Sequence, residues 1–291
     1  MIYKIKNEQL SVEISSLGAE LYSIKTNDGC EYLWQGNPEY WGGRAPIMFP
    51  ICGRLFEGKY TYLGKEYSMP SHGIARSSEF SLKEQGDSFI TLSLISNEET
   101  KKMYPFDFVF DVTFSLKGSS LVVSYKVTNT ETKELIFGVG GHPAFNVPLE
   151  KGLNFEDYRV EFEKSCEALR VDFSPTCFLT ENDKIYTQGG TKAINLRHDL
   201  FDNDAIFLYN VPKKIKLYSD KGEKSVTLKY DNMKYIGLWH AVKKDAPYLC
   251  IEPWTSIPAT DGLVDDLMSK KEMIHLDSGY TYKSRYEIVI K

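Results

Sequence analysis

Apolar and polar residues alternate along many short stretches of this 291-residue chain. Alternation with a period of two predicts β-strands, because successive side chains of a strand point to opposite faces. Gly, Asn and Asp separate neighbouring stretches, which predicts antiparallel hairpins. Strands are expected over residues 10–15, 19–25, 31–33, 80–84, 89–95, 108–116 and 121–128, with a hairpin over 59–67.

Two segments depart from this alternation and suggest short helices. Residues 97–103 begin at Asn97, a common N-cap residue, and carry acidic residues in the first turn and lysines in the last. A second short helix is expected over residues 261–270. Because strands are so numerous, the chain is predicted to be all-β, a large antiparallel β-sandwich with one or two short helices. No linker or internal repeat marks a boundary, so residues 1–291 are expected to form one domain.

The composition fits a folded protein and narrows the range of partners. Hydrophobic residues make up 42% of the chain and charged residues 26%, which is far from the composition of disordered chains. The formal net charge is -5, and charges of both signs are interspersed. Nucleic acid is therefore not expected as a partner, since binding to a phosphate backbone requires concentrated basic residues.

The sequence also suggests a cellular location. The first residues lack the apolar run of a secretion signal, and no stretch approaches the roughly 20 apolar residues that cross a bilayer. We therefore expect a cytoplasmic protein without membrane association, either a monomer or a homodimer. The five cysteines are scattered and include no CxxC pair, which argues against a disulfide framework or a structural zinc site.

Four segments concentrate polar residues beside glycine or proline. The first, residues 41–54, places Arg44 and Arg54 on either side of an apolar run. It is either a buried connector whose arginines reach solvent or a site whose guanidinium groups bind a ligand. The second joins His72 to Arg76 through a glycine-containing stretch. A lone histidine is more often a structural hydrogen-bonding residue than a catalytic one.

The third and fourth segments hold the strongest candidates for chemistry. Residues 138–148 place His142 between glycines and a proline, and the glycines are expected to leave room for a ligand. Residues 249–258 place Glu252 after an apolar stretch. A carboxylate there is costly to bury unless it is paired or functional, and the structural alternative is a salt bridge on an edge strand. Trp254 offers a flat face of the kind that stacks on a sugar ring.

Taken in order along nearly the whole chain, these segments resemble the galactose mutarotase or aldose 1-epimerase superfamily, in particular its LacX-like branch. The resemblance is carried by Arg-x-Pro-x-x-Phe-Pro at 44–50, His-Gly-x-Ala-Arg at 72–76, Gly-His-Pro-x-Phe-Asn at 141–146 and Glu-Pro-Trp at 252–254. It implies a β-sandwich enzyme that interconverts the α and β anomers of a free aldohexose. Such an enzyme needs no metal, nucleotide or redox cofactor.

The resemblance also implies roles for individual residues. The family's general base falls on Glu252 and its general acid falls on His142. The residues expected to bind the sugar are His72, Arg44, Arg76, Trp254 and Asp204. For the last of these, Asp202 is the alternative. Mutarotation removes a proton from the C1 hydroxyl and supplies one to the ring oxygen, and a carboxylate with a histidine suits that task near neutral pH.

Other functions stay open at this stage. Arg44, Arg54 and Arg76 could bind the phosphate of a hexose 6-phosphate, or the chain could be a sugar-binding protein without catalytic activity. A glycosidase would normally use two carboxylates rather than a carboxylate and a histidine. A cupin-like metalloenzyme would draw its ligands from His72, His142, His240 and Glu252.

Overall fold

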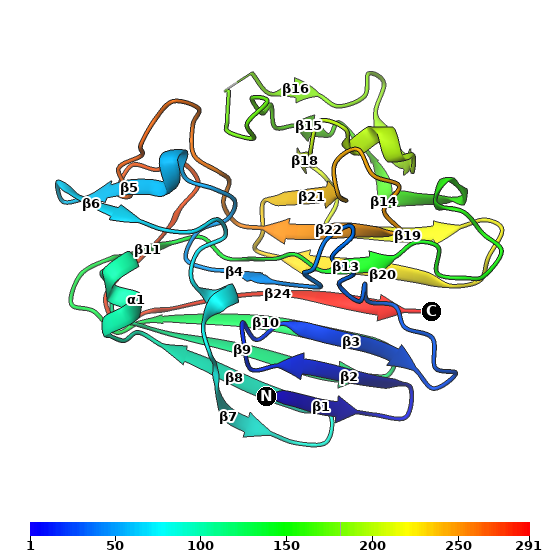
Figure 1. Ribbon diagram of the computed structural model, residues 1–291, viewed down its shortest axis with the longest axis horizontal. Helices are drawn as coiled ribbons and strands as arrows, with labels where there is room; N and C mark the ends of the chain where they lie inside the picture. The colour runs from blue at the N-terminus through cyan, green and yellow to red at the C-terminus, as the bar shows by residue number, and fades with distance from the viewer. Residues whose placement is uncertain (181) are drawn as a thin grey trace.

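Two large sheets dominate the computed structural model, which describes residues 1–180 and 182–291 (Figure 1). The larger sheet has nine strands and is antiparallel throughout. In spatial order its strands are β17 (Thr191–Asn195), β14 (Tyr158–Cys166), β19 (Lys214–Ser219), β20 (Ser225–Asp231), β24 (Thr281–Ile290), β10 (Ser120–Asn129), β9 (Phe108–Lys117), β8 (Phe89–Ile95) and β7 (Ser81–Gln85).

The second large sheet has eight strands, several of them only two or three residues long. Its spatial order is β16 (Lys184–Ile185), β15 (Leu169–Arg170), β18 (Ile206–Tyr209), β21 (Tyr235–Trp239), β22 (Tyr248–Trp254), β12 (Gly140–Gly141) and β4 (Ile47–Met48), and β13 (Ala144–Asn146) also pairs with β22. The central strand β22 therefore has β21 on one side and both β12 and β13 on the other.

Smaller elements complete the fold. A three-stranded sheet and two strand pairs comprise β1 (Ile2–Lys6), β2 (Leu10–Ser15) and β3 (Leu21–Thr26), β5 (Lys59–Tyr62) with β6 (Lys65–Ser68), and β11 (Leu135–Phe137) with β23 (Ile274–Leu276). The helices are α1 (Glu98–Met103) and the 3₁₀ turns η1 (Phe56–Gly58), η2 (Ala75–Ser77), η3 (Phe155–Asp157) and η4 (His198–Phe201). None of the helices in the described residues is long and apolar enough to span a membrane.

The two large sheets share one hydrophobic core. Along β10, Leu121, Val123 and Val127 alternate with more exposed residues and are fully buried. They join a cluster that also contains Leu249 and Ile251 of β22. This packing confirms the predicted antiparallel β-sandwich. Every residue of β22 is buried, because its second face is covered as well, and that second face carries the candidate site.

One of the two predicted helices is present. Asn97 caps α1 by accepting hydrogen bonds from the backbone N–H groups of Glu99 and Thr100, and α1 lies at the same end of the molecule as the β5–β6 hairpin (Figure 1). The helix expected over residues 261–270 is not formed. The backbone there exchanges hydrogen bonds with Thr61 of β5 instead, so tertiary pairing outweighs the local preference.

Candidate active site

A cavity of about 290 Å³ opens over the eight-stranded sheet. Its floor includes residues of β18, β21 and β22, and loops that contain residues 41–46, 53–54, 71–76 and 173–177 contribute to its rim. Six of the seven sequence-predicted site residues line this cavity, and Arg44 does not. The six are His72, Arg76, His142, Asp204, Glu252 and Trp254.

The register of the sheet sets the floor of the cavity. Glu252 of β22 pairs with Gly237 of β21, and Gly237 pairs with Phe207 of β18. Residues directly opposite one another in adjacent strands share a face of the sheet. A Cβ atom on Gly237 would lie 2.5 Å from the Phe207 ring, so this glycine allows the ring to lie flat beside Glu252. The cavity therefore has an aromatic floor next to a carboxyl group.

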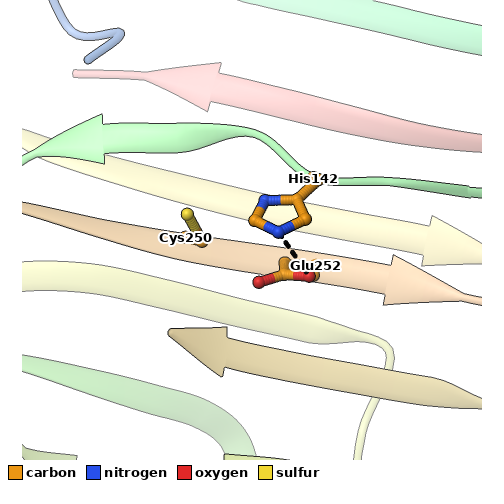
Figure 2. Close-up of side chains that lie close together, drawn as sticks. All are labelled: His142, Cys250 and Glu252. Atoms are coloured by element: carbon orange, nitrogen blue, oxygen red, sulfur yellow. Dashed lines mark ion pairs between the residues drawn. The ribbon is translucent and has the colours of Figure 1, made fainter. Parts of the chain in front are cut away.

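The same register brings His142 to Glu252. Gly140 pairs with Trp254, and the ladder resumes beyond His142 in the same register. Counting two residues forward from Gly140 and two residues back from Trp254 places His142 opposite Glu252. The Nε2 atom of His142 is 3.3 Å from Glu252 Oε2 (Figure 2). On its other side, the backbone N–H of His142 donates to the carbonyl of Pro46. The two predicted catalytic residues thus lie side by side at the cavity.

Burial controls the protonation of this pair. The exposed fraction is 7% for His142 and 2% for Glu252. Burial lowers the pKa of the His142 imidazole, and burial together with the nearby Asp204 carboxylate raises the pKa of Glu252. Both pKa shifts arise because an isolated charge costs free energy in a buried site. The pair consequently holds one proton between an oxygen and a nitrogen, and it offers one proton donor and one proton acceptor.

Tryptophan rings fix the orientation of the His142 imidazole. Trp41 stacks on this ring at a centroid distance of 5.0 Å, and Trp239 meets it edge-on at 5.7 Å. Both tryptophans line the cavity, and neither is a sequence-predicted site residue. Trp239 could have been found from strand parity, because it lies two residues from Gly237 and hence on the same face of β21.

His72 joins the same cluster. Its ring meets His142 edge-on at 5.6 Å and Trp254 edge-on at 5.5 Å. Its Nδ1 atom accepts a hydrogen bond from the backbone N–H of Gly53 at 3.2 Å, so the ring proton belongs on Nε2. Burial, with help from the neighbouring His142 and two arginines, lowers the pKa of His72 well below its usual value. His72 is therefore a neutral hydrogen-bond donor.

The three candidate arginines separate into two groups. Arg54 and Arg76 line the cavity with exposed side chains, and within the described residues neither guanidinium forms an ion pair with a carboxylate. Arg44 lies elsewhere: its guanidinium covers the Tyr22 ring and donates to the Tyr22 carbonyl at 2.6 Å and to Gln35 Oε1 at 3.0 Å. Arg44 is therefore not brought into the cavity lining with the other candidates.

The two candidate aspartates are also separated. Asp204 lines the cavity. Its Oδ1 atom accepts from the backbone N–H of Ala205 at 2.9 Å, and its Oδ2 atom accepts from the Cys177 thiol at 2.7 Å. Asp202 is exposed at the end of η4 and is not part of the lining. The geometry favours Asp204 over Asp202 as the residue that faces a ligand.

Two further expectations are corrected. His240 is fully buried away from the cavity, where its Nε2 atom lies 3.1 Å from His198 Nδ1, so it cannot complete a cupin-like ligand set. The glycines before His142 serve packing rather than ligand access. A Cβ atom on Gly141 would lie 2.8 Å from the Tyr286 ring, and one on Gly138 would lie 2.6 Å from the Ser256 side chain.

Comparison with known proteins agrees with this fold. Residues 1–288 match the family model for aldose 1-epimerase. The chain is 35% identical to the plasmid-encoded protein LacX of Lactococcus lactis subsp. lactis, with 100% of this chain and 99% of that protein covered. It also resembles the structure of a galactose mutarotase related enzyme from Lactobacillus acidophilus, with 36% identity, a TM-score of 0.94, and coverage of 100% of this chain and 97% of that one.

A second solved structure gives the same result. A galactose mutarotase-like protein from Lactobacillus casei ATCC 334 is 30% identical, with a TM-score of 0.95 and full coverage of both chains. Both likenesses extend over the whole chain, including β22 with Glu252 and the connection between β12 and β13 with His142. From the match of residues 1–288 and from these relatives, the chain belongs to the aldose 1-epimerase family.

Proposed function

We propose that this protein is an aldose 1-epimerase that interconverts the α and β anomers of a free aldohexose. The observation that carries the proposal is the buried His142–Glu252 pair, with 3.3 Å between Nε2 and Oε2, beside a cavity with aromatic walls. Starting from the arrangement with the shared proton on His142, Glu252 accepts the proton of the C1 hydroxyl while His142 donates a proton to the ring oxygen. The ring opens, the C1–C2 bond rotates, and reclosure reverses the two transfers.

The shared proton of the pair suits this reaction. Ring opening needs one donor and one acceptor at the same moment, and reclosure needs the same groups with the proton on the other partner. Because His142 and Glu252 are buried, hydrogen bonds from hydroxyl groups of a bound sugar can stabilise either arrangement of the shared proton. A group that acts as general acid or base typically contributes about 10²- to 10⁴-fold to the rate.

Groups around the pair suit a sugar. The faces of Trp254 and Phe207 provide apolar surface for the C–H side of a pyranose ring. The Nε2–H group of His72 provides a donor, and the Asp204 carboxylate provides an acceptor for hydroxyl groups. We propose that these four residues hold the substrate while the His142–Glu252 pair moves the protons.

The proposal is tested by dissolving the pure α anomers of several aldoses and following the approach to equilibrium by polarimetry or NMR. We expect the protein to accelerate it for at least one sugar. Glu252→Gln and His142→Asn should each reduce the acceleration by about 10²-fold or more. Glu134→Gln and His275→Asn are matched controls, because these two residues form an exposed Glu–His contact of 2.6 Å away from the cavity.

Two results would contradict the proposal. If folded Glu252→Gln and His142→Asn variants both keep full activity, the assignment of the acid/base pair is wrong. If the protein binds sugars in a direct binding measurement but accelerates mutarotation of none of them, the chain is a sugar-binding protein rather than an epimerase. Circular dichroism of each variant establishes that the fold is intact.

A phosphorylated hexose is the second candidate substrate, and a specific observation favours it. Arg54 and Arg76 present guanidinium groups to the cavity without a carboxylate partner among the described residues, and such groups bind phosphate well. Arg54→Met and Arg76→Met should raise KM about ten- to a hundredfold for a hexose 6-phosphate, since a charge-assisted hydrogen bond contributes about 1.5–3 kcal/mol.

The free sugar provides the comparison in the same assay. If the two substitutions change KM equally for the free sugar and for its 6-phosphate, the arginines contact hydroxyl groups and the phosphate assignment fails. Arg44→Met serves as the control, because Arg44 lies over Tyr22 and outside the cavity lining. It should change KM for neither sugar.

A further inference from the structure

A cysteine thiol lies next to the acid/base pair and has no part in the proposed reaction. Cys250 precedes Glu252 by two residues on β22, so both side chains lie on the same face of the strand. Figure 2 shows the Cys250 side chain beside the His142–Glu252 pair. The three residues are buried, and each offers one ligand atom within 4.8 Å of the others.

We propose that His142, Cys250 and Glu252 together bind a soft divalent cation such as Zn²⁺, and that the bound cation blocks the acid/base pair. An imidazole nitrogen, a thiolate sulfur and a carboxylate oxygen are the three donor types that zinc uses in proteins. The proposed binding of the cation rests only on the arrangement of these three residues. The proposed inhibition by the cation also rests on the epimerase activity proposed above.

The spacing of the ligand atoms is close to what zinc requires. Tetrahedral coordination with ordinary zinc bond lengths places neighbouring nitrogen and oxygen ligands about 3.4 Å apart, and nitrogen and sulfur ligands about 3.5 Å apart. The Nε2–Oε2 distance of 3.3 Å between His142 and Glu252 already meets this value. The Cys250 sulfur lies within 4.8 Å of a ring nitrogen of His142 and of a carboxylate oxygen of Glu252, so a shift of about 1 Å in these side chains would bring all three ligand atoms to zinc spacing.

Charge and hydrogen bonding also favour a cation at this place. A thiolate at Cys250 and a carboxylate at Glu252 together neutralise a divalent ion, so binding leaves no net charge in the dry interior. The Nδ1 atom of His142 has no hydrogen-bond partner among the described residues, so it can carry the ring proton and leave the Nε2 lone pair for the metal. The fourth coordination position would face the cavity, which His142 and Glu252 line.

The binding step is tested by adding Co²⁺ to the full-length protein and recording the absorption spectrum. Cobalt replaces zinc at such sites, and a bound thiolate gives a thiolate-to-cobalt charge-transfer band. We expect this band in the unsubstituted protein and its displacement by Zn²⁺. Cys250→Ala should abolish it. Cys52→Ala is the matched control, because Cys52 is also buried but lies outside the three-residue cluster, and it should leave the band unchanged.

The inhibition step is tested by measuring mutarotation with increasing Zn²⁺, with each variant compared with its own metal-free rate. Zn²⁺ should inhibit the unsubstituted protein and Cys52→Ala alike, and a chelator should restore the rate. The concentration for half inhibition should rise by roughly tenfold or more in Cys250→Ala, since even loss of an outer-shell partner typically weakens metal binding 10–100-fold.

Several outcomes would overturn the inference. No charge-transfer band at saturating Co²⁺, or a band that persists in Cys250→Ala, would show that the cluster does not bind the metal through this thiol. A normal band without inhibition would refute the blocking of the acid/base pair. If the metal-free protein lacks epimerase activity, the proposed function fails, whereas the cobalt spectrum still decides whether the metal site exists.

Discussion

Asp204 lines the cavity from an unusual backbone conformation. Its φ angle of +72° lies in the left-handed region, which residues other than glycine seldom adopt. Such strain costs about 1–3 kcal/mol and is concentrated at functional sites. Contacts with Ala205 and Cys177 hold the carboxylate in place. Asp202, only two residues away, is exposed and lacks this environment.

The contrast between the two aspartates gives a prediction about sugar binding. Asp204→Asn should raise KM for the preferred sugar about ten- to a hundredfold, because hydrogen bonds from sugar hydroxyls to a carboxylate contribute about 1.5–3 kcal/mol. Asp202→Asn should leave KM unchanged. Initial rates of mutarotation over a range of sugar concentrations measure both effects. Equal KM values for the two variants would contradict the assignment of Asp204.

At the scale of residues, the sequence predicts the polar candidates better than the aromatic ones. Glu252 and His142 stand out because each is a polar residue in an apolar or glycine-rich context. Trp41 and Trp239 do not stand out, since an isolated tryptophan in a β-rich chain is usually a core residue. The sequence could not show that Arg44 lies over Tyr22 and outside the cavity lining, because the direction of a long side chain depends on neighbours that are distant in sequence.

At the scale of elements, two loops interlock to form part of the cavity rim. The backbone N–H of Phe49 donates to the carbonyl of His72, and the N–H of His72 donates to the carbonyl of Gly53. Gly73 has a φ angle of +78°, and a Cβ atom there would collide with the backbone carbonyl of Phe49. This glycine is therefore required by close approach of the two loops as well as by its conformation.

Substitution of this glycine is predicted to be costly. Gly73→Ala should lower the free energy of unfolding by about 3 kcal/mol or more, because a left-handed conformation and a backbone collision both oppose the methyl group. Gly64→Ala is the control: Gly64 has a φ angle of +75° but open space around its Cα, so the cost should be about 1–2 kcal/mol. Urea unfolding measures both, and equal costs would show that the loops can separate.

The elements that the sequence predicts best are long hairpins. The predicted strands 108–116 and 121–128 correspond to β9 and β10, which pair across a short turn. The strands β4 and β12 are only two residues long, and they form because Gly140 and Met48 pair with each other across the fold. Residues 261–270 fail as a helix for the same reason, since a partner far away in sequence determines their backbone hydrogen bonds.

At the scale of the whole molecule, the fully buried His240 contacts the partly buried His198 at a distance from the cavity. The Nδ1 atom of His240 lies 2.9 Å from the carbonyl of Ala241, so it carries the proton and donates. Its Nε2 atom then accepts from His198 Nδ1 at 3.1 Å. Burial, with a contribution from His198, lowers the pKa of His240 to about 4. Glu156 lies 3.8 Å from the outer nitrogen of His198.

This histidine pair predicts a pH dependence of stability. The unfolded chain binds a proton at His240 below about pH 6.5, whereas the folded protein does so only near pH 4, so folding is disfavoured as the pH falls through this range. Between pH 7 and pH 5 the contribution of His240 should fall by about 2 kcal/mol. His240→Gln should lose correspondingly less stability over that range in urea unfolding. An identical pH profile for both proteins would contradict the neutral state of His240.

The overall sandwich follows from the alternating pattern, but the order of strands does not. The C-terminal strand β24 pairs with β10 and β20 and so lies in the middle of the nine-stranded sheet (Figure 1). Nothing in the alternation of residues 281–290 distinguishes a central strand from an edge strand. Such order depends on contacts between residues that are far apart in the chain, which local periodicity does not encode.

Phe207, Gly237 and Glu252 form a row across the paired strands β18, β21 and β22, and His142 lies in the two-residue connection between β12 and β13, whereas Arg54 and Asp204 lie on longer connecting segments. The proposed base Glu252 is thus held by the sheet, whereas Arg54 and Asp204, two of the proposed ligand-binding residues, lie on segments of a kind that tolerates insertion and exchange. On the proposed mechanism, changes to these connecting segments should alter which carbohydrate is bound while leaving Glu252 in place.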